Sequence, residues 1–165
     1  MRTRFAPAPI GIALLLAALS SGAIAVDTDT TPPLSSAHAA GKKAIEARDW
    51  NQAIKSLTAA AQREGRNSDI QNLLGYAYRN AGQLDTAFKH YNLALQLDPR
   101  HLGAHEYIGE AYLMVNNLAK AEEHLAQLKR LCPLSCEEYD DLRKKVEQHR
   151  ARAKEQQCLE NRVID

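Results

Sequence analysis

The sequence predicts an all-α protein, an α-solenoid of three helical hairpins followed by a C-terminal capping helix. The first observation is a set of small residues that recur every 34 positions. They are Gly41, Gly75 and Gly109 on the first helix of each copy, and Ala53, Ala87 and Ala121 on the second. The second observation is the helical spacing of the apolar residues around those marks. A fixed period of this length is typical of stacked hairpins, which bury their apolar faces only against one another.

The first segment, residues 1–25, is expected to be a secretory signal peptide. Arg2 and Arg4 precede an uncharged apolar stretch from 10 to 19, and a small-x-small cleavage site ends at Ala25. The apolar stretch is too short for a spanning helix. We therefore expect cleavage after Ala25 and an exported protein, periplasmic if the source is bacterial, or otherwise secreted.

The charge balance excludes some classes of partner. The chain has 21 Lys and Arg against 20 Asp and Glu, a formal charge of +1. Loss of the leader removes two arginines and no acid, so the formal charge becomes −1. A nucleic-acid or anionic-membrane partner would call for a basic excess, which this chain does not have. We expect neither nucleic-acid binding nor membrane insertion.

The pattern divides the mature chain into a lead-in, three copies and a cap. Residues 26–34, with a Pro-Pro pair and no apolar periodicity, are expected to be flexible. The three copies are then expected to occupy 34–67, 68–101 and 102–135. Each is predicted to hold two antiparallel helices, and proline or a polar loop marks the boundary between copies.

Residues 136–165 are predicted to form the capping helix and a polar tail. Ser135 is expected to cap this helix, with Glu138 reaching back in a capping box. Tyr139, Leu142 and Val146 give the helix an apolar stripe, which an open array needs to cover its last hydrophobic face. From about Gln148 the chain is nearly all polar, so we expect it to fray towards its end.

The recurring marks resemble the tetratricopeptide repeat over about Leu34 to Ser135. The resemblance implies a right-handed superhelical array in which Tyr78 and Tyr112 fill the space that the small residues leave. The first copy departs from the pattern, with Ala44 in place of the tyrosine and Gly65 in place of the proline. The chain from Cys132 to Leu142 also resembles the ends of some small exported bacterial repeat proteins.

In that family the first helices line a concave groove that takes up a peptide or partner segment. Carried over by repeat position, the groove residues are His38, Lys42, Glu46, Asp69, Asn72, Tyr76, Arg79, Asn80, Glu106, Glu110 and Met114. Tyr76 and Arg79 suit recognition, and Asn72 can hydrogen-bond an extended backbone. The alternative is that these residues are only the solvated sides of amphipathic helices. The clamp that some members use for a terminal carboxylate is not assembled: Lys42 fits it, but the neighbouring clamp positions hold His38, Leu73, Gly103 and Tyr107.

The cysteines raise the question of a disulfide. Cys132 and Cys136 span the break before the capping helix, and in an exported protein we favour a structural disulfide that clips the cap onto the array. The alternative is a redox or metal-binding pair, since Cys136 lies at a helix N-terminus where thiolate is favoured. Cys158 is then unpaired, and can be free or can join two chains in a homodimer.

No metal or catalytic site is expected. His101 precedes the helix that carries His105, and His90 and His124 are expected to lie about 10 Å apart on packed outer helices, so neither pair has further ligands in register. The sequence contains no nucleophile elbow, phosphate loop or zinc-protease motif. We therefore expect a protein that is not an enzyme and binds no cofactor.

The function predicted from the sequence is that of an exported adaptor that binds a protein or peptide segment in its groove. Two alternatives remain open. One is a thiol-redox or metal-handling accessory protein that uses Cys132 and Cys136. The other is a self-assembling structural protein, with Cys158 as a bridge between copies.

Overall fold

The computed structural model describes residues 34–164, and within that range every regular element is an α-helix. The expected signal peptide and almost all of the lead-in lie outside the described residues. The helices are α1 (Leu34–Glu46), α2 (Trp50–Arg63), α3 (Ser68–Asn80), α4 (Leu84–Leu97), α5 (Leu102–Met114), α6 (Leu118–Leu131) and α7 (Glu137–Ile164). The all-α fold class is confirmed.

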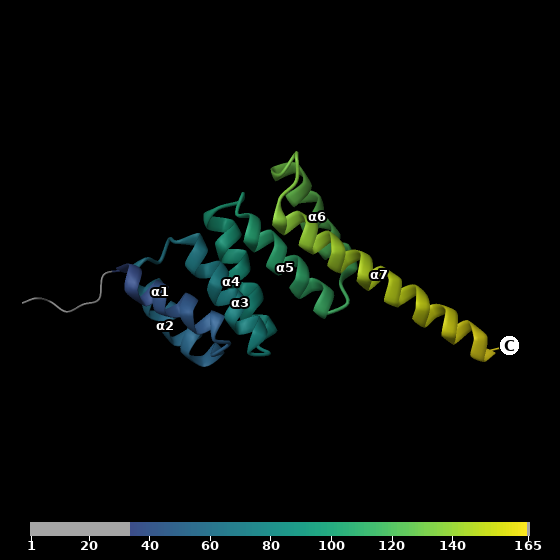
Figure 1. Cartoon of the computed structure of the whole chain (residues 1–165), viewed down its shortest axis with the longest axis horizontal. Coiled ribbons are helices and arrows are strands. Elements are labelled where there is room, and N and C mark those ends of the chain that lie inside the picture. Colours follow the sequence, from purple (N-terminus) through teal and green to yellow (C-terminus); the bar gives the residue numbers. More distant parts are fainter. Residues whose placement is uncertain (1–33, 165) are drawn as a thin grey trace, which may run out of the picture. The chain divides into compact units, whose positions relative to one another are not determined.

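Consecutive helices pair as hairpins, α1 with α2, α3 with α4 and α5 with α6, and α7 packs on the last pair (Figure 1). The turn inside each hairpin repeats one local conformation. Arg48, Gly82 and Asn116 have φ values of 56°, 78° and 56°, and they stand 34 residues apart. Asp49 and Asn117, one residue later, cap α2 and α6 by accepting backbone N–H groups. A single left-handed residue therefore reverses the chain in every copy.

The glycines of the first helices allow large side chains to approach the backbone. A Cβ atom on Gly75 would lie 2.5 Å from the ring of Tyr91, and one on Gly41 would lie 2.5 Å from Leu57. In the third hairpin the neighbour of Gly109 is Leu142 of α7, at 2.6 Å. Tyr78 and Tyr112 are not the nearest side chains to these glycines. They pack against the core clusters that contain Ala87 and Ala121, and they stack on histidines.

The capping helix is longer than predicted. The chain was expected to fray from about Gln148, but α7 continues to Ile164. Its first half buries Leu142 and Val146 against α6, while every side chain described from 150 to 159 is exposed. Helical hydrogen bonds lie within the segment itself, so a polar sequence can remain helical without a partner surface.

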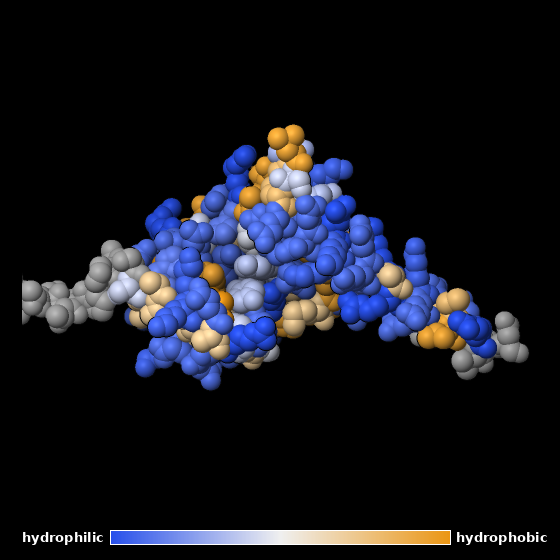
Figure 2. Space-filling view, viewed as in Figure 1, coloured by the Kyte–Doolittle hydropathy of each residue, from blue (hydrophilic) through white to orange (hydrophobic). Residues whose placement is uncertain are grey.

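The turn before α7 differs from the predicted capping box. Ser135 does not pair with Glu138; its hydroxyl donates to Asp140 Oδ2 at 2.6 Å. Cys132 and Cys136 form a disulfide with their Cα atoms 5.8 Å apart. The five-residue loop that this bond closes carries Leu134, which is 98% exposed. Figure 2 shows apolar surface at the α6–α7 turn.

Histidines link the two helices of the second and third hairpins at equivalent positions. His90 Nδ1 lies 2.8 Å from Gln71 Oε1, and one repeat later His124 Nδ1 lies 3.0 Å from His105 Nδ1. His105 Nε2 lies 3.0 Å from the carbonyl oxygen of Pro99. Because a carbonyl can only accept, His105 carries a proton on Nε2, and when this ring is neutral its Nδ1 accepts from Nδ1 of His124. The two rings cannot both be protonated in this arrangement, because two N–H groups would then face each other.

None of the helices described between residues 34 and 164 combines the length with the apolar character needed to cross a membrane.

The close approach at Gly75 predicts that Gly75→Ala destabilises the protein. The new methyl group would overlap the ring of Tyr91, whose side chain is fully buried, and overpacking of this kind costs about 1–3 kcal/mol. Gly65→Ala is the matched control, because its Cβ would meet only a backbone oxygen at 3.4 Å. Urea denaturation should show the loss for Gly75→Ala alone. Equal midpoints for the two variants would contradict the packing argument.

The histidine pair predicts that stability falls in mild acid. Burial, followed by the charge of His105, lowers the pKa of His124 to about 4, and burial also lowers that of His105. The unfolded chain, with histidine pKa near 6.5, then binds protons that the folded chain excludes. The free energy of unfolding should drop between about pH 6.5 and pH 4, by an amount on the order of 2 kcal/mol once partial hydration of the rings is allowed for.

His105→Gln is the control for this pH dependence, because it recreates the Gln71–His90 pair of the second hairpin. This variant should lose less stability than the natural protein between pH 6.5 and pH 4, measured by denaturant titration at each pH. An identical loss in both proteins would show that the histidine pair is not responsible.

Candidate functional site

The predicted groove residues lie on the first helices, but the structure exposes only some of them. Lys42, Asp69 and Asn80 are exposed, and Tyr76 and Glu110 are half-buried. Three others are buried, with exposed fractions of 6% for Asn72, 8% for Arg79 and 8% for Glu106. Buried polar groups are normally occupied by internal partners. The central residues of the predicted groove therefore form part of the inter-repeat packing.

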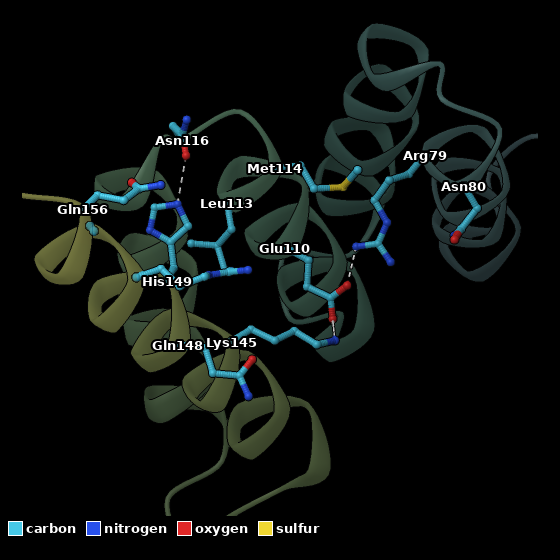
Figure 3. A pocket seen from close by; sticks show the side chains of 12 residues that line it. Arg79, Asn80, Glu110, Leu113, Met114, Asn116, Lys145, Gln148, His149 and Gln156 are labelled. Carbon is cyan, nitrogen blue, oxygen red and sulfur yellow. Dashed lines mark hydrogen bonds and ion pairs between the residues drawn. The ribbon is translucent and has the colours of Figure 1, made fainter. Parts of the chain in front are cut away.

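Arg79 joins three helices through its internal partners. Its guanidinium pairs with Glu110 of α5 and donates to the carbonyl oxygen of Tyr107 at 3.2 Å. Lys145 of α7 pairs with the other carboxylate oxygen of Glu110. Figure 3 shows Glu110 between Arg79 and Lys145, joined to both. Truncating one member of such a buried set would leave a charge unpaired, so Arg79 has a structural role.

A row of aromatic rings lies beside this ion-pair cluster. Tyr76 packs edge-to-face on Trp50 with ring centroids 6.1 Å apart, and lies 4.9 Å from Tyr107. The guanidinium carbon of Arg79 is 5.2 Å from the centre of Tyr76 and 5.5 Å from that of Tyr107. All three rings are half-buried. Of the three, only Tyr76 was predicted from the sequence. Trp50 was expected in the turn, but it is the first residue of α2. Tyr107 was considered only as a departure from the clamp.

A cavity of about 940 Å³ lies where α3, α5 and α7 meet (Figure 3). Its walls include four of the predicted groove residues, namely Arg79, Asn80, Glu110 and Met114. They also include the apolar side chain of Leu113 of α5 and the amide of Asn116, in the turn after α5. Half of the lining comes from α7 and was not predicted: Lys145, Gln148, His149, Arg152, Ala153 and Gln156. We call this cavity the capping-helix pocket.

The half of the pocket lining that comes from α7 was not predicted, because the chain was expected to fray from about Gln148. A tail without fixed structure has no defined face, so its side chains could not be assigned to a site. The available signal was the spacing of Lys145, Gln148, Arg152 and Gln156, which recur at three or four residues and so share one helical face. His149 attaches this part of α7 to the array, with its Nε2 3.1 Å from Asn116 Oδ1.

The remaining predicted groove residues lie outside the pocket lining. Asp69 Oδ1 lies 3.0 Å from Nε2 of His101, the residue before α5. Lys42 is exposed on α1. Asn72 has a buried Oδ1 that finds no hydrogen-bond partner in the described part of the chain, and its Nδ2 occupies the space beside Gly103. Burial, followed by the neighbouring Glu110, raises the pKa of Glu106 above that of a free carboxyl group.

The histidine and cysteine candidates have structural contacts. His101 accepts from Ala104 N at 3.2 Å and so caps α5, which separates it from His105 as expected. His90 and His124 each contact the first helix of their own hairpin, through Gln71 and His105 respectively. Among the described residues, no group of three or more histidines, cysteines or acids is arranged to hold a metal ion. Cys158 is exposed and unpaired in the single chain.

Comparison with known families and proteins supports the repeat assignment. Two tetratricopeptide repeat models match residues 38–101 and 79–146, so together they span all three hairpins and the start of α7. The human protein O-mannosyl-transferase TMTC3 is 28% identical over 85 residues, which is 52% of this chain. The match covers 9% of the length of that relative. The mannosyl-transferase name therefore describes a far larger protein.

Solved structures show the same fold. The TPR2B domain of yeast Sti1, in a complex with pHsp70, has a TM-score of 0.64 at 23% identity, covering 70% of this chain and 96% of that one. The second TPR domain of human RPAP3, in complex with an HSP70 peptide, has a TM-score of 0.62 at 19% identity, covering 69% and 94%. At such identities the likeness shows the fold alone. With the matching family models, it establishes that this chain belongs to the tetratricopeptide repeat family.

Proposed function

We propose that this chain is an exported adaptor that binds a segment of a partner protein in the capping-helix pocket and has no catalytic chemistry of its own. The observation that carries the proposal is the pocket itself. It has a volume of about 940 Å³, within the range of protein ligand sites. One of its lining residues, Arg79, packs over the half-buried rings of Tyr76 and Tyr107, which do not line the pocket themselves. Arginine and tyrosine are enriched among the residues that contribute most to protein recognition.

The lining chemistry suits a polypeptide. Met114 is 58% exposed and offers a flexible apolar surface at the pocket wall. Four amide side chains, each able to donate and to accept hydrogen bonds, also line the pocket: Asn80, Asn116, Gln148 and Gln156. Amides of this kind can pair with both groups of a peptide backbone. A pocket for a purely apolar ligand would not need them.

The structural neighbours are consistent with this proposal, since the yeast and human domains were solved with a chaperone segment or peptide bound. The chaperone tail itself is disfavoured for this chain. Four positions of the terminal-carboxylate clamp hold other residues here: His38, Leu73, Gly103 and Tyr107. The proposed partner is therefore recognised by the pocket beside α7 and not by that clamp.

Export is proposed from the leader sequence at residues 1–25. An oxidising compartment would also maintain the Cys132–Cys136 bond, which joins the end of α6 to the start of α7. A bond in this position favours the structural role of the cysteine pair over the redox role. It holds the helix that supplies half of the pocket lining.

Site-specific photo-crosslinking tests the proposal. A photoreactive phenylalanine analogue replaces Met114 in the pocket, and in a control protein it replaces Leu93, an exposed apolar residue of α4 that does not line the pocket. In the native exported fraction, the probe at position 114 should capture a protein that the probe at position 93 does not. The captured protein, once purified, should bind Met114→Glu at least tenfold more weakly than the natural chain. Capture of the same proteins at both positions, or of none at 114, would refute the proposal.

A further inference from the structure

We propose that the segment bound in the capping-helix pocket is acidic, and that its carboxylates are held by Arg152 and Lys145 of α7. The inference rests on the proposed function and specifies the chemistry of the partner. The side chains that line the pocket carry an excess of positive charge. Three cations, Arg79, Lys145 and Arg152, face the pocket, against one acid, Glu110. With His149 neutral the lining has a formal charge of +2, although the whole chain carries only +1.

Two of these cations are available to a ligand. Arg79 is buried and occupied by Glu110 and the Tyr107 carbonyl, so it contributes charge but no free donor. Lys145 is 45% exposed and makes one bond, to Glu110, which leaves two of its three N–H groups. Arg152 is exposed and has no ion-pair partner within residues 34–164. Its planar guanidinium can hold a carboxylate through two parallel hydrogen bonds.

Nearby acids do not cancel this excess. Glu110 is already shared between Arg79 and Lys145. Glu106 lies behind it, and burial together with the adjacent Glu110 raises the pKa of Glu106, which reduces its negative charge near neutral pH. Asp141 acts on Glu106 from α7 but does not line the pocket. An incoming carboxylate therefore meets a positive field with little local opposition.

The shape of the pocket favours a peptide over a small anion. Its lining follows α7 from Lys145 to Gln156. At about 1.5 Å per residue this is a length of about 16 Å, which an extended chain spans with about five residues at roughly 3.3 Å each. The four lining amides can pair with its backbone, while Lys145 and Arg152, two helical turns apart, contact different side chains. These cations lie on the capping helix, away from the clamp positions of the first helices.

The test uses defined peptides. Fluorescein-labelled hexaglutamate, hexaglutamine and hexalysine are titrated with the mature protein, and binding is measured by fluorescence anisotropy at low and at physiological salt. Hexaglutamate should bind at least tenfold more tightly than the other two, and its affinity should decrease as salt increases. Backbone amide NMR shifts should change from 145 to 156 on α7 when it binds.

Two charge reversals on exposed residues separate the pocket from the general surface. Arg152→Glu should weaken hexaglutamate binding at least tenfold, while Arg130→Glu, on α6 and outside the pocket, should leave it unchanged. Both variants must first show the helical content of the natural protein by circular dichroism. Equal losses in the two variants would mean that hexaglutamate responds only to overall charge, which would overturn the inference.

The inference and the proposed function can fail separately. Binding of hexaglutamine as tight as that of hexaglutamate, with amide shifts on α7, would refute the acidic preference and leave peptide binding intact. Absence of binding by all three peptides would refute the acidic preference. If position 114 also captured no protein, the proposed function would fail with it.

Discussion

The contact between Leu142 and Gly109 is the one on which the pocket depends. In the first two hairpins the glycine of the first helix receives a side chain from the second helix, Leu57 or Tyr91. In the third hairpin Gly109 receives Leu142, so α7 uses a close approach that elsewhere belongs within a repeat. This contact fixes how α7 is rotated about its own axis. As a result, the residues that follow Leu142 at intervals of three and four positions face the pocket.

The charged cluster then specifies how the three helices meet. Replacing a buried ion pair by apolar residues is often neutral for stability, so the set of Arg79, Glu110 and Lys145 is better understood as a constraint on geometry than as a source of stability. Each member comes from a different helix, α3, α5 or α7. A shift of α7 along its axis would leave Glu110 without one of its two cations. The same cluster supplies part of the positive field of the pocket.

The hairpins could be predicted from the sequence because the features that form them are local. Arg48, Gly82 and Asn116 stand one period apart and adopt the same left-handed conformation, and the small residues recur in the same register. The length of α7 and the burial of Arg79 could not be predicted in this way. Both depend on contacts between segments far apart in sequence. From sequence alone, an arginine on the polar side of a helix is indistinguishable from one in solvent.

The structure also buries three polar residues that the sequence placed in the groove. Asn72, Arg79 and Glu106 are buried between helices, so their substitution changes the packing of the array before it can report on a partner. Met114 and Arg152 are exposed at the pocket wall and can be changed without disturbing the buried contacts. The proposed recognition is therefore best tested on the face shared by α5 and the capping helix, because substitutions of exposed residues there can change binding without a change in folding.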